Sequence, residues 1–206
     1  MKRQTIIAIL FALVAMAGQA QILKTTEATF NDYVPLLNAK GYMAYSFDTK
    51  DFKGKQLEPI VMEYVDGKEV GSYLHFDASF PAGKKLVIGF APSDTDSLYV
   101  YSFLSDKGKG FTGKLKLKPV FVPRGPTKQR YLYQSRPIET DYAVDAGKFV
   151  PLALFGSYWW DADSGVIRFC GENIIKPDLS SDIIKHIPHF YILGIKVAGT
   201  GQKEGM

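Results

Sequence analysis

The sequence predicts an all-β fold, an antiparallel two-sheet β-sandwich of jelly-roll-like type with one or two short helices. About ten short β-rich runs are separated by Gly, Pro, Asp and Ser at the spacing typical of sandwiches and barrels. The segment Phe149–Phe155 is apolar at both alternating sets of positions, which favours a strand covered on both faces. The chain has no internal repeat and no βαβ rhythm, so the alternative fold is a β-barrel rather than a parallel sheet.

The first twenty residues have the pattern of a secretory signal peptide. Lys2 and Arg3 precede an apolar core at 6–16, and Ala17–Ala20 supplies the small residues that suit cleavage before Gln21. This core is shorter than the roughly 20 residues that a membrane-spanning helix needs. We therefore expect an exported protein, periplasmic or extracellular, whose mature chain has no transmembrane segment.

Length and composition indicate a single domain after export. Residues 21–198 are expected to form one β-rich domain, and 199–206 a disordered tail. Loss of Lys2 and Arg3 lowers the formal net charge from +4 to +2, which indicates no particular charged partner. The single cysteine, Cys170, cannot form an intrachain disulfide and is expected to be a small buried side chain.

One helix and a series of hairpins are expected before the central hydrophobic segment. Asn31 or Asp32 would cap a helix near 34–40. Asp66-Gly67 is the clearest hairpin turn, because both residues tolerate positive φ. The expected strands are 42–48, 57–65, 69–76, 86–91, 98–104, 114–122, 130–134 and 138–144, the last two divided by Arg136-Pro137.

The C-terminal part is expected to pack around Phe149–Phe155. The predicted elements are a hairpin over 149–170 with its turn at 161–165, a short helix over 179–187 and a last strand over 189–198. Ser180 or Ser181 would cap the helix and Pro188 would end it.

Five aromatic residues are the candidate ligand-binding residues: Tyr158, Trp159, Trp160, Tyr131 and Tyr133. Flat rings on a sheet or its rim can stack against sugar rings, and tryptophan adds an N–H donor. Strand alternation places Tyr158 and Trp160 on one side and Trp159 on the other. The alternative interpretation is that these rings fill the core, as strand aromatics commonly do.

No metal site or other cofactor is predicted. Asp161 and Asp163 resemble a fragment of a calcium loop, but the distal Glu is missing, and Asp, Ser and Gly are equally typical of a hairpin turn. His186 and His189 form an H-x-x-H pair, but Pro188 between them breaks the helical geometry that would aim both at one ion.

No catalytic residue is predicted either. The sequence contains no nucleophile elbow, zinc-protease motif, phosphate-binding glycine loop or Cys-x-x-Cys. Carboxylates that hydrolyse glycosides meet in space rather than in sequence. Glu58, Glu63, Asp77 and Glu172 therefore remain open as candidates.

The end of the signal segment, Met-Ala-Gly-Gln-Ala-Gln, and the run Val166–Glu172 followed by Pro177-Asp178-Leu179 resemble small exported all-β proteins of unknown function from Bacteroidetes-type bacteria. The resemblance implies a location in or outside a Gram-negative envelope. It carries over no functional residue.

Two functions follow from these observations. The first is a non-enzymatic binding module that presents aromatic rings to a glycan or another envelope component. The alternative is a structural or assembly protein of the envelope that engages another protein through a sheet edge or through the lysine-rich stretch 107–118. Export argues against a nucleic-acid partner, and the oligomeric state stays open.

Overall fold

The computed structural model describes residues 29–74, 79–106, 108–123 and 129–198. The predicted signal peptide and C-terminal tail lie outside these residues. The unit that ends at Val34 contributes the first part of helix α2 (Phe30–Ala39). Thr29 precedes this helix, and its backbone N–H donates to Oδ2 of Asp32 (2.6 Å), so the predicted caps Asn31 and Asp32 lie inside the helix.

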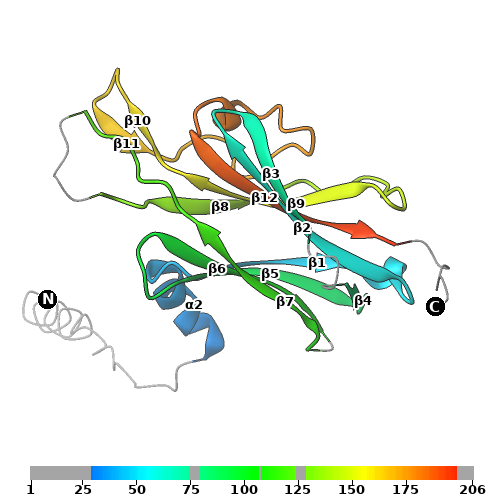
Figure 1. Ribbon diagram of the computed structural model, residues 1–206. Coiled ribbons are helices and arrows are strands. Elements are labelled where there is room, and N and C mark those ends of the chain that lie inside the picture. Colours follow the sequence, from blue (N-terminus) through cyan, green and yellow to red (C-terminus); the bar gives the residue numbers. More distant parts are fainter. Residues whose placement is uncertain (1–28, 75–78, 107, 124–128, 199–206) are drawn as a thin grey trace, which may run out of the picture. The chain divides into compact units, whose positions relative to one another are not determined.

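The described strands form two larger antiparallel sheets that pack face to face and a separate two-stranded ribbon (Figure 1). Sheet A has the order β1-β5-β6-β7, and sheet B the order β3-β2-β12-β9-β8 with β4 paired to β2. Sheet A contains β1 (Met43–Asp48), β5 (Lys85–Pro92), β6 (Leu98–Ser105) and β7 (Gly110–Lys116). Sheet B contains β2 (Gln56–Val65), β3 (Lys68–Leu74), β4 (Phe80–Pro81), β8 (Tyr133–Pro137), β9 (Phe149–Ser157) and β12 (His189–Val197). The predicted sandwich is confirmed, and in the described part of the chain the strands do not close into a barrel.

Two predicted strand boundaries are wrong for identifiable reasons. The runs 130–134 and 138–144 were divided at Pro137, but β8 spans this division. Proline is tolerated there because it ends a strand at the edge of sheet B, where a missing N–H costs little. The run 114–122 was placed too late, because β7 already pairs with β6 from Gly110, opposite Leu104.

Strand β9 lies between β12 and β8 in sheet B and is covered on both faces, as predicted. Its alternation is interrupted by a bulge, because β12 pairs Leu193 with Ala153 and then Gly194 with Pro151, which leaves Leu152 without a partner on β12. Leu152 and Ala153 therefore both join the core between the sheets.

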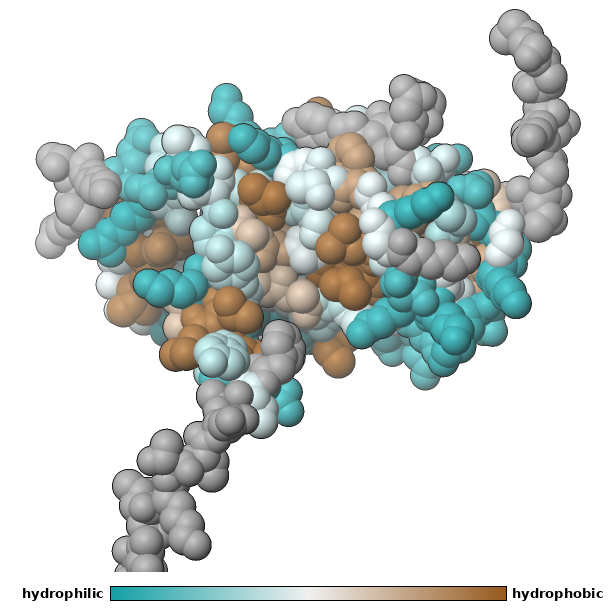
Figure 2. All heavy atoms as spheres, turned by 90° about the horizontal axis from the view of Figure 1, so that it is seen from below, coloured by the Kyte–Doolittle hydropathy of each residue, from teal (hydrophilic) through white to brown (hydrophobic). Residues whose placement is uncertain are grey.

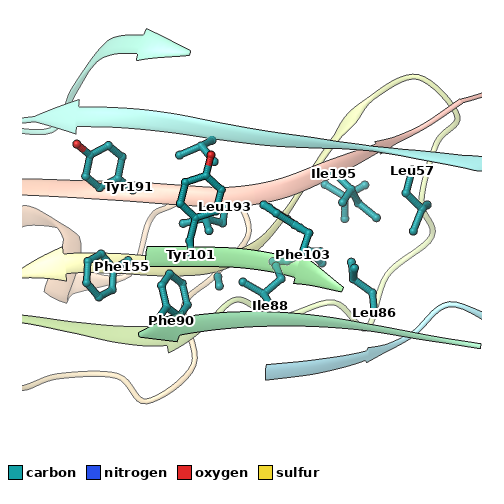
Figure 3. Close-up of a cluster of buried hydrophobic side chains, with 14 of the residues drawn as sticks. Leu57, Leu86, Ile88, Phe90, Tyr101, Phe103, Phe155, Tyr191, Leu193 and Ile195 are labelled. Carbon is teal, nitrogen blue, oxygen red and sulfur yellow. The ribbon is translucent and has the colours of Figure 1, made fainter. Parts of the chain in front are cut away.

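The core between the sheets is aromatic at one end and aliphatic at the other (Figure 3). The ring of Phe155 from sheet B stacks on Phe90 from sheet A, with centroids 4.9 Å apart. Ile88, Leu86 and Ile195 continue the contact toward the other end, and all are at most 2% exposed. Burial of such side chains contributes roughly 1.5–3 kcal/mol each, which holds the sheets together without a disulfide.

A second core covers the outer face of sheet B. Leu154 of β9 contributes to this core from the sheet. A ribbon of β10 (Trp159–Asp161) and β11 (Val166–Arg168) follows β9, and the segment after the ribbon, which begins with Phe169, supplies the other side of the core. The 3₁₀ helix η2 (Asp182–Lys185) is shorter than the predicted helix over 179–187, and Ser181 precedes it without a side-chain cap hydrogen bond, because its hydroxyl accepts the backbone N–H of Lys176. The predicted hairpin over 149–170 is confirmed only in its distal part, since β11 pairs with β10 and not with β9.

The outer face of sheet A carries apolar side chains on β5 and β6 and the exposed Lys114 and Lys116 on β7. Val87 lies beside Leu104, and Ala91 beside Val100, in the registers that join β5 to β6. Figure 2 views the molecule from this side and shows hydrophobic patches between hydrophilic margins. No helix among the described residues is both long enough and apolar enough to span a membrane.

Candidate binding groove

A groove of about 460 Å³ lies between edge strand β1 of sheet A and edge strand β8 of sheet B. We call it the β1–β8 groove. Its lining includes three tyrosines, two amides and one guanidinium: Tyr45, Tyr133, Tyr158, Asn38, Gln134 and Arg136. Alternation along β8 places Tyr133 on the side of the core between the sheets, and Gln134 and Arg136 on the side of Tyr158 and Phe169, so the groove follows the edge of β8.

Tyr45 and Ser135 connect the two edges of the sandwich at the base of the groove. Their hydroxyl oxygens lie 2.8 Å apart, and the Ser135 hydroxyl also lies 3.1 Å from the sulfur of Met43. Burial raises the pKa of Tyr45, so its hydroxyl stays protonated at neutral pH. This contact fixes the spacing of the edge strands where no backbone ladder joins them.

Tyr133 is held by a chain of hydrogen bonds that runs into the interior. Its ring stacks on Phe155 (5.2 Å), and its hydroxyl accepts the backbone N–H of Lys118 (3.0 Å) and contacts Nδ1 of His189. Nε2 of His189 lies 2.9 Å from a carboxylate oxygen of Glu63. A neutral histidine with its proton on Nε2 satisfies both ring nitrogens, because it donates to Glu63 and accepts from Tyr133.

Burial accounts for the protonation state of this chain. The side chain of His189 is 2% exposed, and its burial lowers the pKa more than the hydrogen bond that it donates to Glu63 raises it. Burial also raises the pKa of Tyr133. Both groups are therefore neutral at pH 7, and the ring of Tyr133 is a rigid part of the groove.

Two other polar side chains of the groove, those of Gln134 and Arg136, have hydrogen-bond donors that are unpaired among the described residues. The Tyr158 hydroxyl donates to Oε1 of Gln134 (3.0 Å), while the amide nitrogen of Gln134 has no hydrogen-bond partner among the described residues. Nη1 of Arg136 donates to the carbonyl of Ser135 (3.2 Å), and its guanidinium lies 4.9 Å from the ring centre of Phe169. Within the described ranges, Nε of Arg136 is the only buried side-chain nitrogen or oxygen without a partner. A buried donor left in this state costs about 1–3 kcal/mol.

The structure separates the five predicted aromatic residues. Tyr133 and Tyr158 line the β1–β8 groove. Tyr131 lines a different pocket of about 410 Å³, and its hydroxyl donates to Gln129. Trp159 packs in the second core and stacks on His186, with centroids 5.5 Å apart.

Trp160 is half-buried in β10, opposite Ile167. The alternation prediction is wrong for Tyr158 and Trp159, because both pack against Phe169. The physical reason is that β9 ends before Tyr158 and β10 begins after it, so strand alternation does not run through this residue.

Asp161 and Glu172 make local hydrogen bonds that hold a turn and the start of η2. Asp161 closes the predicted turn: its side chain accepts the backbone N–H of Asp163 (3.1 Å) and the hydroxyl of Ser164 (2.7 Å). Glu172 accepts the backbone N–H of Asp182 (2.7 Å) at the start of η2. Asp77 lies outside the described residues. The described chain offers no group of three His, Cys, Asp or Glu side chains that could hold a metal ion.

The prediction that Cys170 is buried is wrong. The side chain is exposed and lies on the same alternating set of positions as the exposed Val166. Phe169 is the buried residue at this point of the chain.

Sequence reasoning missed four of the groove residues, namely Asn38, Tyr45, Gln134 and Arg136. Tyr45 lay on a correctly predicted strand, but nothing in the sequence indicates that this strand lies opposite β8. Gln134 was predicted at the end of the strand 130–134, and Arg136 in the gap before the next strand. The prediction therefore missed that both residues lie on edge strand β8.

The chain matches the family model of a domain of unknown function (DUF5041) over residues 12–199. Comparisons with curated proteins and with solved structures gave no match. The geometry of the groove therefore carries the functional argument.

Proposed function

We propose that this chain, which belongs to the family of the domain of unknown function DUF5041, is an exported, non-enzymatic protein that binds a glycan in the β1–β8 groove. The observation that carries the proposal is the convergence of three tyrosines, two amides and one guanidinium in a single groove. The signal-peptide pattern of the first twenty residues supports an envelope or extracellular location.

The lining groups match both the apolar C–H face and the hydroxyl groups of a sugar. Tyrosine rings present flat apolar surface to the C–H face of a pyranose, and amides and guanidinium groups donate to its hydroxyl oxygens. Gln134 and Arg136 retain donors that no acceptor in the described part of the chain uses. These groups support binding, whereas glycoside hydrolysis normally uses a pair of carboxylates.

Preorganisation also supports the proposal. Tyr133 is fixed by Phe155 and His189, and Tyr158 is fixed by Phe169 and Gln134. A ligand that stacks on these rings does not have to immobilise them, which reduces the entropy cost of binding.

Affinity electrophoresis against immobilised neutral and acidic polysaccharides tests the proposal. For any polysaccharide that retards the protein, Gln134→Ala removes one ligand hydrogen bond and is expected to weaken binding about fivefold. Arg136→Gln removes a charged donor and is expected to weaken it about tenfold or more. Tyr131→Phe, which changes only the separate pocket, is the matched control and should leave binding unchanged.

Two results would refute the proposal. One is the absence of retardation by every polysaccharide tested. The other is retardation that Gln134→Ala and Arg136→Gln leave unaltered, with circular dichroism showing that both variants fold.

The outer face of sheet A favours a second candidate function, assembly with another envelope protein. Val87, Ala91, Val100 and Leu104 are exposed or half-buried apolar residues on this face. Apolar patches of this kind mark protein interfaces. A Leu104→Glu variant that loses a pull-down partner, while the wild type retains it, would support assembly.

A further inference from the structure

A second pocket, of about 520 Å³, opens at the other end of β1. It lies between the end of β1, the 3₁₀ helix η1 (Lys50–Phe52), the loop 140–144 and the beginning of β9. We call it the β1–η1 pocket. It shares no lining residue with the β1–β8 groove.

The inner part of the β1–η1 pocket is apolar. Leu86, Val150, Leu152 and Ile195 belong to the core between the sheets and are at most 5% exposed, yet they line this pocket. The half-buried rings of Phe47 and Phe52 and the side chain of Val144 form its walls. A ligand that enters would therefore place its apolar part against the aliphatic end of the core.

The rim of the same pocket is negatively charged. Three carboxylates, from Asp48, Asp51 and Asp141, line it together with one ammonium group, from Lys50, so the formal charge of the lining is −2. Lys50 lies 2.7 Å from Asp48 and pairs with it. Asp51 and Asp141 make no ion pair within the described residues, and the carboxylates do not meet closely enough to form a metal site there.

We propose that the β1–η1 pocket is a second binding site, for an organic cation that carries a short apolar group. The apolar group would fill the space above Leu152 and Ile195, and the cation would lie at the rim beside Asp51 and Asp141. Charge complementarity selects this ligand class, because an anion of the same shape would meet a net negative rim. The inference is independent of glycan binding in the β1–β8 groove.

Isothermal titration calorimetry of the full chain with n-hexylammonium chloride at low ionic strength tests this proposal. Sodium hexanoate and 1-hexanol are the matched probes, because they keep the apolar chain and change the charge. Hexylammonium is expected to bind with one site per chain and at least about tenfold more tightly than hexanoate. Its affinity should fall as salt is raised, since the rim carboxylates are exposed.

Variants localise the site. The double variant Asp51→Asn/Asp141→Asn should weaken hexylammonium binding by about three- to tenfold and leave hexanol binding unchanged. Val144→Phe should weaken the binding of all three probes by filling the pocket, with the fold checked by circular dichroism. Gln134→Ala, in the other groove, should change none of them.

Three outcomes would overturn the proposal. Hexylammonium and hexanoate binding equally well would show that charge does not select the ligand. The absence of heat up to about 10 mM hexylammonium would mean that the pocket does not bind the probe. Unchanged binding in the Asp51→Asn/Asp141→Asn variant would place the cation elsewhere on the molecule.

Discussion

Replacing Tyr133 with phenylalanine removes one hydroxyl group and leaves the aromatic ring in place. The ring keeps its stacking on Phe155, so the variant isolates the polar contacts. The lost hydroxyl accepts the backbone N–H of Lys118 (3.0 Å) and is the partner of Nδ1 of His189. Because His189 is 2% exposed, its Nδ1 would be left as a buried acceptor without a donor.

The expected cost follows from these two contacts. An unsatisfied buried acceptor costs about 1–3 kcal/mol, whereas the N–H of Lys118 is exposed enough to bind water instead. We therefore expect Tyr133→Phe to lower the free energy of unfolding by about 2–3 kcal/mol. Urea denaturation followed by tryptophan fluorescence measures this value at constant m.

The control is the same substitution at Tyr131, whose hydroxyl makes one exposed contact with Gln129. Tyr131→Phe should change the free energy of unfolding by less than about 0.5 kcal/mol. If Tyr133→Phe costs no more than this control, the chain of hydrogen bonds through His189 does not contribute to stability, and the argument for a rigid Tyr133 in the groove fails.

Three further predictions concern pH, packing and the exposed sheet. Burial lowers the pKa of His189, so on acidification the unfolded chain binds a proton before the folded chain does. The contribution of His189 to stability should be full above about pH 6.5 and be lost below it, by at most about 1.4 kcal/mol per pH unit. His189→Gln should reduce this slope in urea titrations at several pH values. Gly194→Ala should destabilise the fold by about 3 kcal/mol or more, because the added Cβ would lie 2.2 Å from the carbonyl oxygen of Val150. The control is Gly54→Ala, where nothing lies within 4 Å of the added Cβ. In thermal melts this control should lose only roughly 1 kcal/mol of stability, from the positive φ of that position. If the outer face of sheet A associates, sedimentation should show a mass that falls to the monomer in Leu104→Glu, whereas a wild type that stays monomeric at high concentration and captures no pull-down partner would contradict assembly.

Local sequence signals predicted the elements whose conformation is decided locally. Asp66 and Gly67 have φ of 48° and 73° and join β2 to β3, as the two-residue turn required. The double-sided apolar pattern of Phe149–Phe155 correctly indicated a strand with two covered faces. Both signals depend on residues that are adjacent in the sequence.

The candidate site was predicted less well because it depends on contacts between distant residues. The hydroxyl groups of Tyr45 and Ser135 are 90 positions apart in the sequence, and no local pattern pairs β1 with β8. The bulge at Leu152 shifts the face on which Ala153 lies, and the break at Tyr158 ends strand alternation. A strict two-residue period could therefore not place the aromatic rings correctly.

The two proposed sites share one side of the sandwich for a topological reason. Strand β1 is an edge of sheet A and β8 an edge of sheet B, so the side between them has no backbone ladder to close it. The contact of Tyr45 with Ser135 lies in the β1–β8 groove, and the β1–η1 pocket begins at Phe47, further along the same strand. Their charges are opposite, since Arg136 is the charged lining residue of the groove and the rim of the pocket has a formal charge of −2. A glycan and hexylammonium should therefore bind without displacing each other, and mutual displacement in a competition titration would show that they occupy one site.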